Sequence, residues 1–309
     1  MSEIPIWIAH DPVSEHVLEI ARKVAETSTT ILITGESGTG KDQLARLIHE
    51  LGPRRDAPYL KIDCASLPQE LVESELFGHE RGAFTGAVER KLGRLEMAGL
   101  GTIALDEVAA LSTAIQAKLL RVLEERSFER LGGTETLSIE ARLIALTNAD
   151  LQRAVAARRF REDLYFRLSV LAIHVPALRE RRADIVPLAE HMLARLAAVH
   201  GRDGAVLSDA ARHALENYDW PGNIRELKNA IERAVIFGKG TMLLPEDLPE
   251  SIRTADSGAV AGMRSLEDIE REAIQKTLDG THYKITRAAE ILGISRKTLL
   301  DKRKKYGLQ

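Results

Sequence analysis

The chain has 309 residues, of which 44% are hydrophobic and 29% charged, the composition of an ordinary globular protein with room for two or three domains. No apolar run approaches transmembrane length, and the N-terminus lacks the basic start and apolar stretch of a signal peptide. The single cysteine, Cys64, excludes an internal disulfide and suits a reducing compartment, so we expect a cytoplasmic protein with no membrane association.

The first part of the chain predicts strands that alternate with helices. Apolar residues recur at helical spacing over positions 13–25, and the short strand TTILIT follows and ends in glycines. Helical stretches such as Ala114–Glu125 separate further apolar strands, which we expect at Tyr59–Ile62, Gly101–Leu105, Ile139–Leu146 and Ser169–His174. This alternation predicts an α/β fold with a mostly parallel sheet that is covered on both faces.

The strand pattern stops after Pro176. Helices are expected over residues 183–200, 209–218 and 224–237, with Ser208 and Asn223 as N-caps and Gly238 closing the third helix. The capping box Ser265-Leu-Glu-Asp268 opens a last helical unit. We therefore expect four parts, namely an α/β part over 1–175, a small helical domain over 176–250, a linker poor in large apolar residues over 251–264, and a helical domain over 265–309.

A glycine-rich motif follows the first strand and precedes a helix. Residues Gly35, Glu36, Ser37, Gly38, Thr39, Gly40 and Lys41 match G-x-x-x-x-G-K in the context that a phosphate-binding loop requires. The glycines let backbone N–H groups face the phosphates, and Lys41 reaches the β- and γ-phosphates. The motif predicts ATP binding, although Asp42 stands where the generic motif has Ser or Thr beside Mg²⁺.

Two acidic residues end the strand Gly101–Leu105. Asp106 is expected to hold Mg²⁺ through water, and Glu107 is expected to polarise the water that attacks the γ-phosphate. Asp42 needs the same Mg²⁺ nearby to offset its repulsion from phosphate. Together with the loop upstream, the pair predicts an Mg²⁺-dependent ATPase.

Residues 82–87, Gly82, Ala83, Phe84, Thr85, Gly86 and Ala87, spell GAFTGA. Two flanking glycines predict a tight loop tip that presents one aromatic ring and one hydroxyl to a partner. The physical alternative is a glycine turn whose Phe84 folds back into the core.

The last segment predicts a helix-turn-helix. From Ser265 onward the chain has ten Lys and Arg against seven Asp and Glu, although the whole chain carries a net charge of −3. Ala289 allows two helices to approach, Gly293 makes the turn, and Leu299 anchors a second helix over about Arg296 to Lys305. The expected DNA-binding residues are Arg287, Ser295, Arg296, Lys297, Thr298, Lys302, Arg303 and Lys304.

From residue 13 to the end, these motifs resemble the sigma-54-dependent transcription activators, enhancer-binding ATPases of the AAA+ class with a Fis-type DNA-binding domain. The resemblance implies that GAFTGA contacts sigma-54 and that an acidic residue is usual at Asp42. It also implies that Thr147 and Asn148 sense nucleotide, that Arg161 and Arg167 reach the ATP of a neighbouring subunit, and that Arg225 lies near the γ-phosphate of its own subunit.

One residue departs from the family pattern. Asp63 stands where relatives commonly have an Asn that restrains the counterpart of Glu107, and an ionised carboxylate offers only acceptors. Two facing carboxylates repel each other, so we expect the ATPase switch to be tuned differently here.

The resemblance further implies a ring, expected to be a hexamer with dimeric DNA-binding domains, that binds enhancer DNA and remodels the closed complex of sigma-54 RNA polymerase. We also expect no N-terminal sensory domain, as in the phage-shock and Hrp activators, which separate regulatory proteins control. Two other functions remain open, namely a DNA-binding repressor with an idle ATPase and an AAA+ protein unfoldase.

Overall fold

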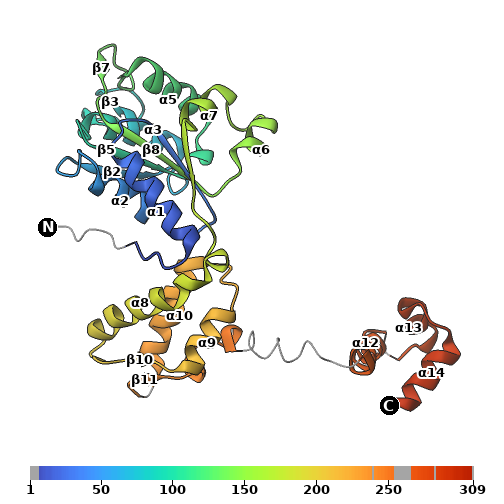
Figure 1. The fold of residues 1–309 in the computed structure, drawn as a ribbon. Helices are drawn as coiled ribbons and strands as arrows, with labels where there is room; N and C mark the ends of the chain where they lie inside the picture. Colours follow the sequence, from blue (N-terminus) through green and yellow to red (C-terminus); the bar gives the residue numbers. More distant parts are fainter. Residues whose placement is uncertain (1–6, 239, 254–265, 282, 308–309) are drawn as a thin grey trace. The chain divides into compact units, whose positions relative to one another are not determined.

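The computed structural model describes residues 7–238, 240–253, 266–281 and 283–307. The chain divides into two compact units, Met1–Glu250 and Ser251–Gln309, and each is described by itself (Figure 1). Most of the expected linker, together with Ser265 of the expected capping box, lies outside the described residues. Within the described residues, no helix has both the length and the apolar character needed to cross a bilayer.

A five-stranded sheet lies at the centre of the first unit, in the order β2-β5-β8-β1-β9, and every neighbouring pair is parallel. Its strands are β1 (Ile31–Thr34), β2 (Tyr59–Asp63), β5 (Thr102–Asp106), β8 (Arg142–Thr147) and β9 (Leu171–His174). The expected parallel α/β fold is therefore confirmed. Four strands, β1, β5, β8 and β9, begin one to three residues later than their apolar patterns suggested.

The strand residues alternate between two cores. Ile103 and Leu105 of β5 belong to one core, whereas Ala104 belongs to the other, because successive side chains point to opposite faces. Helices α1 (Pro12–Ala25) and α2 (Lys41–Leu51) contribute to the core that contains Ala104. The opposite core contains residues of α3 (Gln69–Phe77), α5 (Thr113–Glu125), α6 (Leu151–Ala156) and α7 (Glu162–Leu168) (Figure 1).

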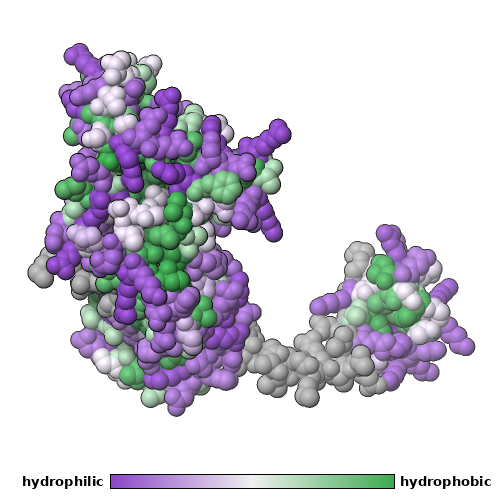
Figure 2. All heavy atoms as spheres, turned by 45° about the horizontal axis from the view of Figure 1, so that its top comes forward, coloured by the Kyte–Doolittle hydropathy of each residue, from purple (hydrophilic) through white to green (hydrophobic). Residues whose placement is uncertain are grey.

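Short elements missed by the sequence patterns complete this part of the unit. They are the helix α4 (Arg94–Met97), the antiparallel pair β3 (Gly78–His79) and β4 (Lys91–Leu92), and the antiparallel pair β6 (Ser127–Glu129) and β7 (Thr136–Ser138). Hydrophilic side chains cover most of the surface visible in Figure 2, and apolar atoms show in smaller patches.

The helical part of the first unit contains α8 (Ile185–Val199), α9 (Asp209–Asn217) and α10 (Asn223–Phe237). The short strands β10 (Val206–Leu207) and β11 (Met242–Leu243) pair in parallel here, where no strand was expected. Ser208 caps α9 as predicted, because its side chain accepts a hydrogen bond from the N–H of Ala211. The N-cap prediction for Asn223 is wrong: Gly222 is the N-cap of α10, and the Asn223 side chain is used elsewhere.

The second unit contains α12 (Leu266–Gly280), α13 (Ile285–Leu292) and α14 (Arg296–Lys305). Ala289 and Leu299 are buried, and Gly293 has a φ of 65° at the end of α13, which the absence of a side chain makes accessible. The predicted small residue, turn glycine and anchor of the helix-turn-helix are confirmed.

Candidate functional site

The glycine-rich loop connects β1 to the N-terminus of α2. Gly38 and Gly40 have φ values of 79° and 99°, and Gly40 directly precedes the first residue of α2. A Cβ on Gly38 would lie 2.5 Å from the carbonyl oxygen of Gly222, so only glycine fits there. The chain thus passes close to α10 and leaves backbone N–H groups at a helix N-terminus, a favourable site for phosphate.

Lys41 is held over this loop. Its Nζ donates hydrogen bonds to the carbonyl oxygens of Gly35 at 2.7 Å and Glu36 at 2.9 Å. Burial lowers the pKa of Lys41, and Glu107, Asp106 and Asp42 oppose that effect. The ammonium therefore places a positive charge at the loop that a phosphate would enter.

The two expected magnesium ligands are Asp42, in the first turn of α2, and Asp106, at the carboxyl end of β5, and both contact the same side chain. One ammonium group bridges them: Lys61 Nζ lies 2.5 Å from Asp42 Oδ2 and 2.8 Å from Asp106 Oδ2. Burial acts to lower the pKa of Lys61, but the hydrogen bonds with Asp106 and Asp42 raise it overall. Carboxylate oxygens that accept a cation in this way suit Mg²⁺. Sequence patterns gave no signal for Lys61.

Glu107 has a left-handed backbone, with φ 53° and ψ 52°. Such a conformation is costly for a residue with a side chain and concentrates at functional sites. The Glu107 carboxylate accepts hydrogen bonds from the backbone N–H of Asn148 at 3.1 Å and from Thr147 Oγ1 at 3.5 Å. The strand ends of β5 and β8 thus place the expected catalytic carboxylate beside the expected sensor residues.

Asp63 is directed away from this contact. It pairs in register with Asp106, but its carboxylate accepts hydrogen bonds from the N–H groups of Ala65 and Ser66 in its own turn. No hydrogen bond links Asp63 to Glu107, both of which are described residues. In this structure Glu107 instead accepts hydrogen bonds from the residues at the end of β8.

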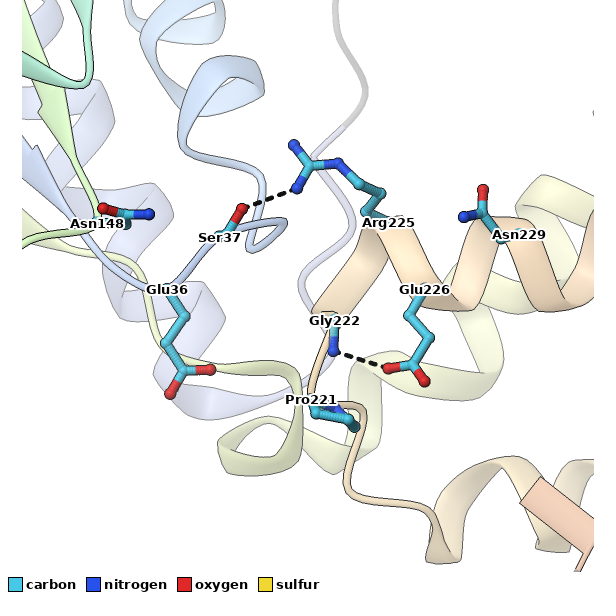
Figure 3. Close-up of a pocket in the computed structure, with 8 residues that line it drawn as sticks. All are labelled: Glu36, Ser37, Asn148, Pro221, Gly222, Arg225, Glu226 and Asn229. Atoms are coloured by element: carbon cyan, nitrogen blue, oxygen red, sulfur yellow. Dashed lines mark hydrogen bonds between the residues drawn. The ribbon is translucent and has the colours of Figure 1, made fainter. Parts of the chain in front are cut away.

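The N-terminus of α10 contacts the phosphate loop directly. Arg225 Nη1 donates to Ser37 Oγ at 2.8 Å, and the N–H of Ile224 donates to the carbonyl of Gly38 at 2.9 Å. Figure 3 shows Ser37 and Arg225 facing each other across the pocket. The cavity has a volume of about 770 Å³ and is lined by Glu36, Ser37, Asn148, Pro221, Gly222, Arg225, Glu226 and Asn229.

Two side chains hold the helical part against the loop: Asn223, which the sequence predicted only as a helix cap, and Arg179, which no sequence pattern singled out. Asn223 is fully buried, and its side chain accepts from the N–H of Leu178 and donates to Glu36 Oε2 and the carbonyl of Ser37. Arg179 donates to both oxygens of Glu36, at 2.9 and 2.5 Å. Hydrogen bonds from Arg179 and Asn223 lower the pKa of Glu36 to about 2.

Replacing Glu36 by glutamine should weaken the contact between the phosphate loop and Arg179. The expected result is nucleotide dissociation roughly two- to fivefold faster, because an exposed ion pair is weak. The pKa of Glu36 in the folded protein lies below its ordinary value of 4.5. Its carboxylate therefore stabilises the contact with Arg179 and Asn223 above that pH and loses this effect only as the pH falls toward about 2. Stopped-flow release of a fluorescent ADP analogue at pH 6 and pH 8 should therefore show the same ratio of rates.

Asp219→Asn is the matched control for that measurement. Asp219 forms an exposed pair with Arg182 at 3.1 Å in the same helical part. If both variants release nucleotide at the parent rate, the Glu36 contact does not hold the loop.

Arg161 and Arg167, the two expected inter-subunit fingers, are exposed at the two ends of α7. Arg161 pairs with Asp163 through two hydrogen bonds of 3.0 and 2.7 Å, and Arg167 donates to the carbonyl of Leu123. These contacts lie on α5 and α7 rather than on the phosphate loop of the same chain. Both residues are exposed, as a contact with a neighbouring subunit would require.

The GAFTGA loop lies between β3 and β4. Its tip is closed by a hydrogen bond of 2.8 Å from the N–H of Gly82 to the carbonyl of Ala87, and Gly82 and Gly86 have φ values of 83° and 108°. Phe84 is 42% exposed and lies edge-on to the His79 ring at 5.0 Å. Thr85 is exposed. The expected loop tip is confirmed, and the alternative in which Phe84 folds into the core is wrong.

The expected DNA-binding residues of the second unit differ in their surroundings. Arg287, Arg296, Lys297 and Lys304 are exposed. Ser295 caps α14 by accepting from the N–H of Thr298. Lys302 pairs with Glu270 of α12, and the Arg303 guanidinium lies 5.9 Å from the centre of the Tyr283 ring.

Comparisons with known proteins agree with this geometry. Three family models match, namely the sigma-54 interaction domain over residues 7–174, the AAA+ ATPase lid domain over 179–263 and the Fis family of bacterial regulatory proteins over 265–306. The chain belongs to the sigma-54-dependent transcriptional activators: it carries an AAA+ ATPase domain with its lid and a DNA-binding helix-turn-helix.

Individual relatives are similar over almost the whole chain. The regulatory protein AtoC of Escherichia coli K12 is 43% identical over 311 residues, an alignment that covers 97% of this chain and 68% of AtoC. The transcriptional regulatory protein ZraR of Salmonella typhimurium is 46% identical over 300 residues, an alignment that covers 96% of this chain and 67% of ZraR. The crystal structure of NtrX from Brucella abortus in complex with ADP has a TM-score of 0.75 and 33% identity, covering 97% of this chain and 70% of NtrX.

Proposed function

We propose that the chain uses ATP hydrolysis at the phosphate loop to convert the closed complex of sigma-54 RNA polymerase and promoter into an open complex. The observation that carries this proposal is an exposed GAFTGA tip in the same unit as a phosphate loop and a strained acidic residue. The loop presents an aromatic ring and a hydroxyl, which are the groups a protein partner would contact. The helix-turn-helix would hold the activator on enhancer DNA. Since its DNA and polymerase are in the bacterial cytoplasm, the activity belongs there.

The residues present fit a magnesium–ATP complex. Asp42 and Asp106 would hold Mg²⁺, with Asp106 acting through water, and Lys41 with the loop N–H groups would bind the phosphates. When bound, Mg²⁺ neutralises the charge that develops on the phosphate oxygens. Glu107 would orient and polarise the attacking water, and Thr147, Asn148 and Arg225 would report the state of the γ-phosphate. These roles are supported by the contacts of Glu107 with Thr147 and Asn148, and of Arg225 with Ser37.

The ring arrangement is part of the proposal. Arg161 and Arg167 would complete the site of a neighbouring subunit in a ring, which we propose to be a hexamer. Arg161→Ala and Lys41→Ala should each abolish turnover, and mixing the two proteins should restore part of it, because a mixed interface can hold one intact loop and one intact finger. Steady-state ATPase across mixing ratios measures this. Mixed rings that form by mass spectrometry yet show no recovery would count against action in trans.

DNA binding should depend on salt through the exposed cations of the second unit. Lys297→Ala should weaken binding and lower the slope of log affinity against log salt by about one, because one counterion fewer is released. Lys302→Ala should leave the slope unchanged and lower the melting temperature, since Lys302 pairs with Glu270. Fluorescence anisotropy from low to high salt tests both. An equal loss of slope for Lys302→Ala would place that lysine among the DNA contacts.

The decisive experiment for the function is open-complex formation. Purified sigma-54 polymerase on promoter DNA should form heparin-resistant open complexes only with this protein and hydrolysable ATP. A non-hydrolysable analogue is the control. DNA binding with ATP turnover but no open complexes at any promoter carrying the enhancer would favour an unfoldase, and DNA binding without turnover would favour a repressor.

A further inference from the structure

The ammonium group of Lys61 lies between the two carboxylates that we propose as magnesium ligands. Its Nζ is 2.5 Å from Asp42 Oδ2 and 2.8 Å from Asp106 Oδ2. The three residues belong to three elements: Lys61 to β2, Asp42 to the first turn of α2, and Asp106 to the end of β5. A single ammonium group of the protein therefore forms ion pairs with both carboxylates.

The strand register explains this contact. Lys61 pairs with Ala104 of β5, and Asp106 lies two residues further along the same strand, on the same face of the sheet. Diagonal neighbours of this kind are within reach of a lysine side chain. Asp42 approaches Lys61 from α2, because α2 begins where the phosphate loop ends and Asp42 lies in its first turn.

The contact is accessible to ions from solvent. The side chains of Lys61, Asp42 and Asp106 are 35%, 52% and 18% exposed, respectively. An ammonium and a divalent metal ion compete for such carboxylates, because both need close contact with the same oxygens and repel each other. Occupancy by one therefore disfavours the other.

We propose that Lys61 is an internal counter-cation that keeps free divalent metal away from the Asp42–Asp106 pair and admits metal only together with nucleotide. Metal bound to ATP has phosphate oxygens as further ligands, and these offset the displacement of the ammonium. Free metal gains only the two carboxylates. The inference rests on the proposed nucleotide site. It adds to that site a residue that favours metal bound to ATP over free metal.

The test measures the binding of Mn²⁺ alone to the full chain without nucleotide, from the electron paramagnetic resonance signal of the free ion. Lys61→Met removes the charge and keeps most of the apolar stem, so it should bind Mn²⁺ at least about tenfold more tightly than the parent. Lys61→Arg keeps the charge and should bind Mn²⁺ as weakly as the parent. Lys118→Met is the matched control, because Lys118 pairs with Glu73 at 2.8 Å on α3 and α5, and its affinity should be unchanged.

A double variant locates the effect. Adding Asp106→Asn to Lys61→Met should abolish the gain, since one of the two metal-binding carboxylates is lost. The proposal is overturned if folded Lys61→Met binds Mn²⁺ no more tightly than the parent, or if the gain survives Asp106→Asn. Should Lys61→Met not fold, Lys61→Gln is used with the same expectations. Neither ATP turnover nor polymerase enters these measurements, so their failure is distinguishable from failure of the proposed function.

Discussion

Replacing Glu107 by glutamine is expected to lower ATP turnover by at least about 100-fold while ATP binding persists, because the attacking water loses its base. The amide can still accept the hydrogen bond that Asn148 donates to Glu107, and the phosphate loop does not contain the change. Steady-state phosphate release measures turnover, and equilibrium binding of a fluorescent ATP analogue measures affinity. Lys41→Ala is the contrasting variant, which should lose binding itself because the ammonium over the loop is gone.

Asp63→Asn is the comparison variant, because Asp63 lies at the end of β2 in register with Asp106, the residue before Glu107. Among the described residues, the Asp63 side chain accepts hydrogen bonds from the N–H groups of its own turn, which an amide oxygen can also do, so turnover should stay near that of the parent. A large change in turnover for Asp63→Asn would show that Asp63 tunes the switch, as the departure from the family pattern suggested. Parent-like turnover in Glu107→Gln would refute the assignment of the catalytic base.

Replacing Thr85 by alanine is expected to abolish open-complex formation, a loss of at least about tenfold, with ATP hydrolysis and DNA binding close to those of the parent. The reason is position: Thr85 is exposed at the tip of the GAFTGA loop, whereas the phosphate-binding residues lie at the ends of β1, β5 and β8. Phe84→Ala should behave similarly, because the exposed part of its ring supplies apolar contact area. Heparin-resistant complexes are counted alongside ATPase and anisotropy measurements on the same preparations.

Val88→Ala is the matched control for these two variants. Val88 is 73% exposed just beyond the loop tip, so it tests whether any truncation near the tip has the same effect. We also expect Thr85→Ala to fail to retain sigma-54 in the presence of ADP with a transition-state analogue such as aluminium fluoride. Normal open complexes with both Thr85→Ala and Phe84→Ala would leave the loop with a structural role only.

The order of the chemical motifs could be read from the sequence. A glycine-rich loop between an apolar strand and a helix, an acidic strand end, and a turn glycine between two helices are local patterns, and each depends on residues close together in the chain. The parallel sheet followed as well, because strands that alternate with helices have few other ways to pack. The first residues of the strands were predicted less accurately. For example, β8 begins at Arg142 and β9 at Leu171, because apolar residues precede the paired segments.

The contacts that decide how the site is held were determined only by the tertiary structure. Lys61 is 45 residues from Asp106 and has no motif of its own, and the register of β2 against β5 brings the two together. Asn223 looked like a helix cap, but the close approach of α10 to the phosphate loop buries its side chain against Glu36 and Leu178. Asp63 could face either Glu107 or its own turn, and its carboxylate accepts hydrogen bonds from the N–H groups of that turn, whereas the Glu107 carboxylate offers no donor. Long-range packing selects among such options, because a polar side chain takes the partners that the fold brings within hydrogen-bonding distance.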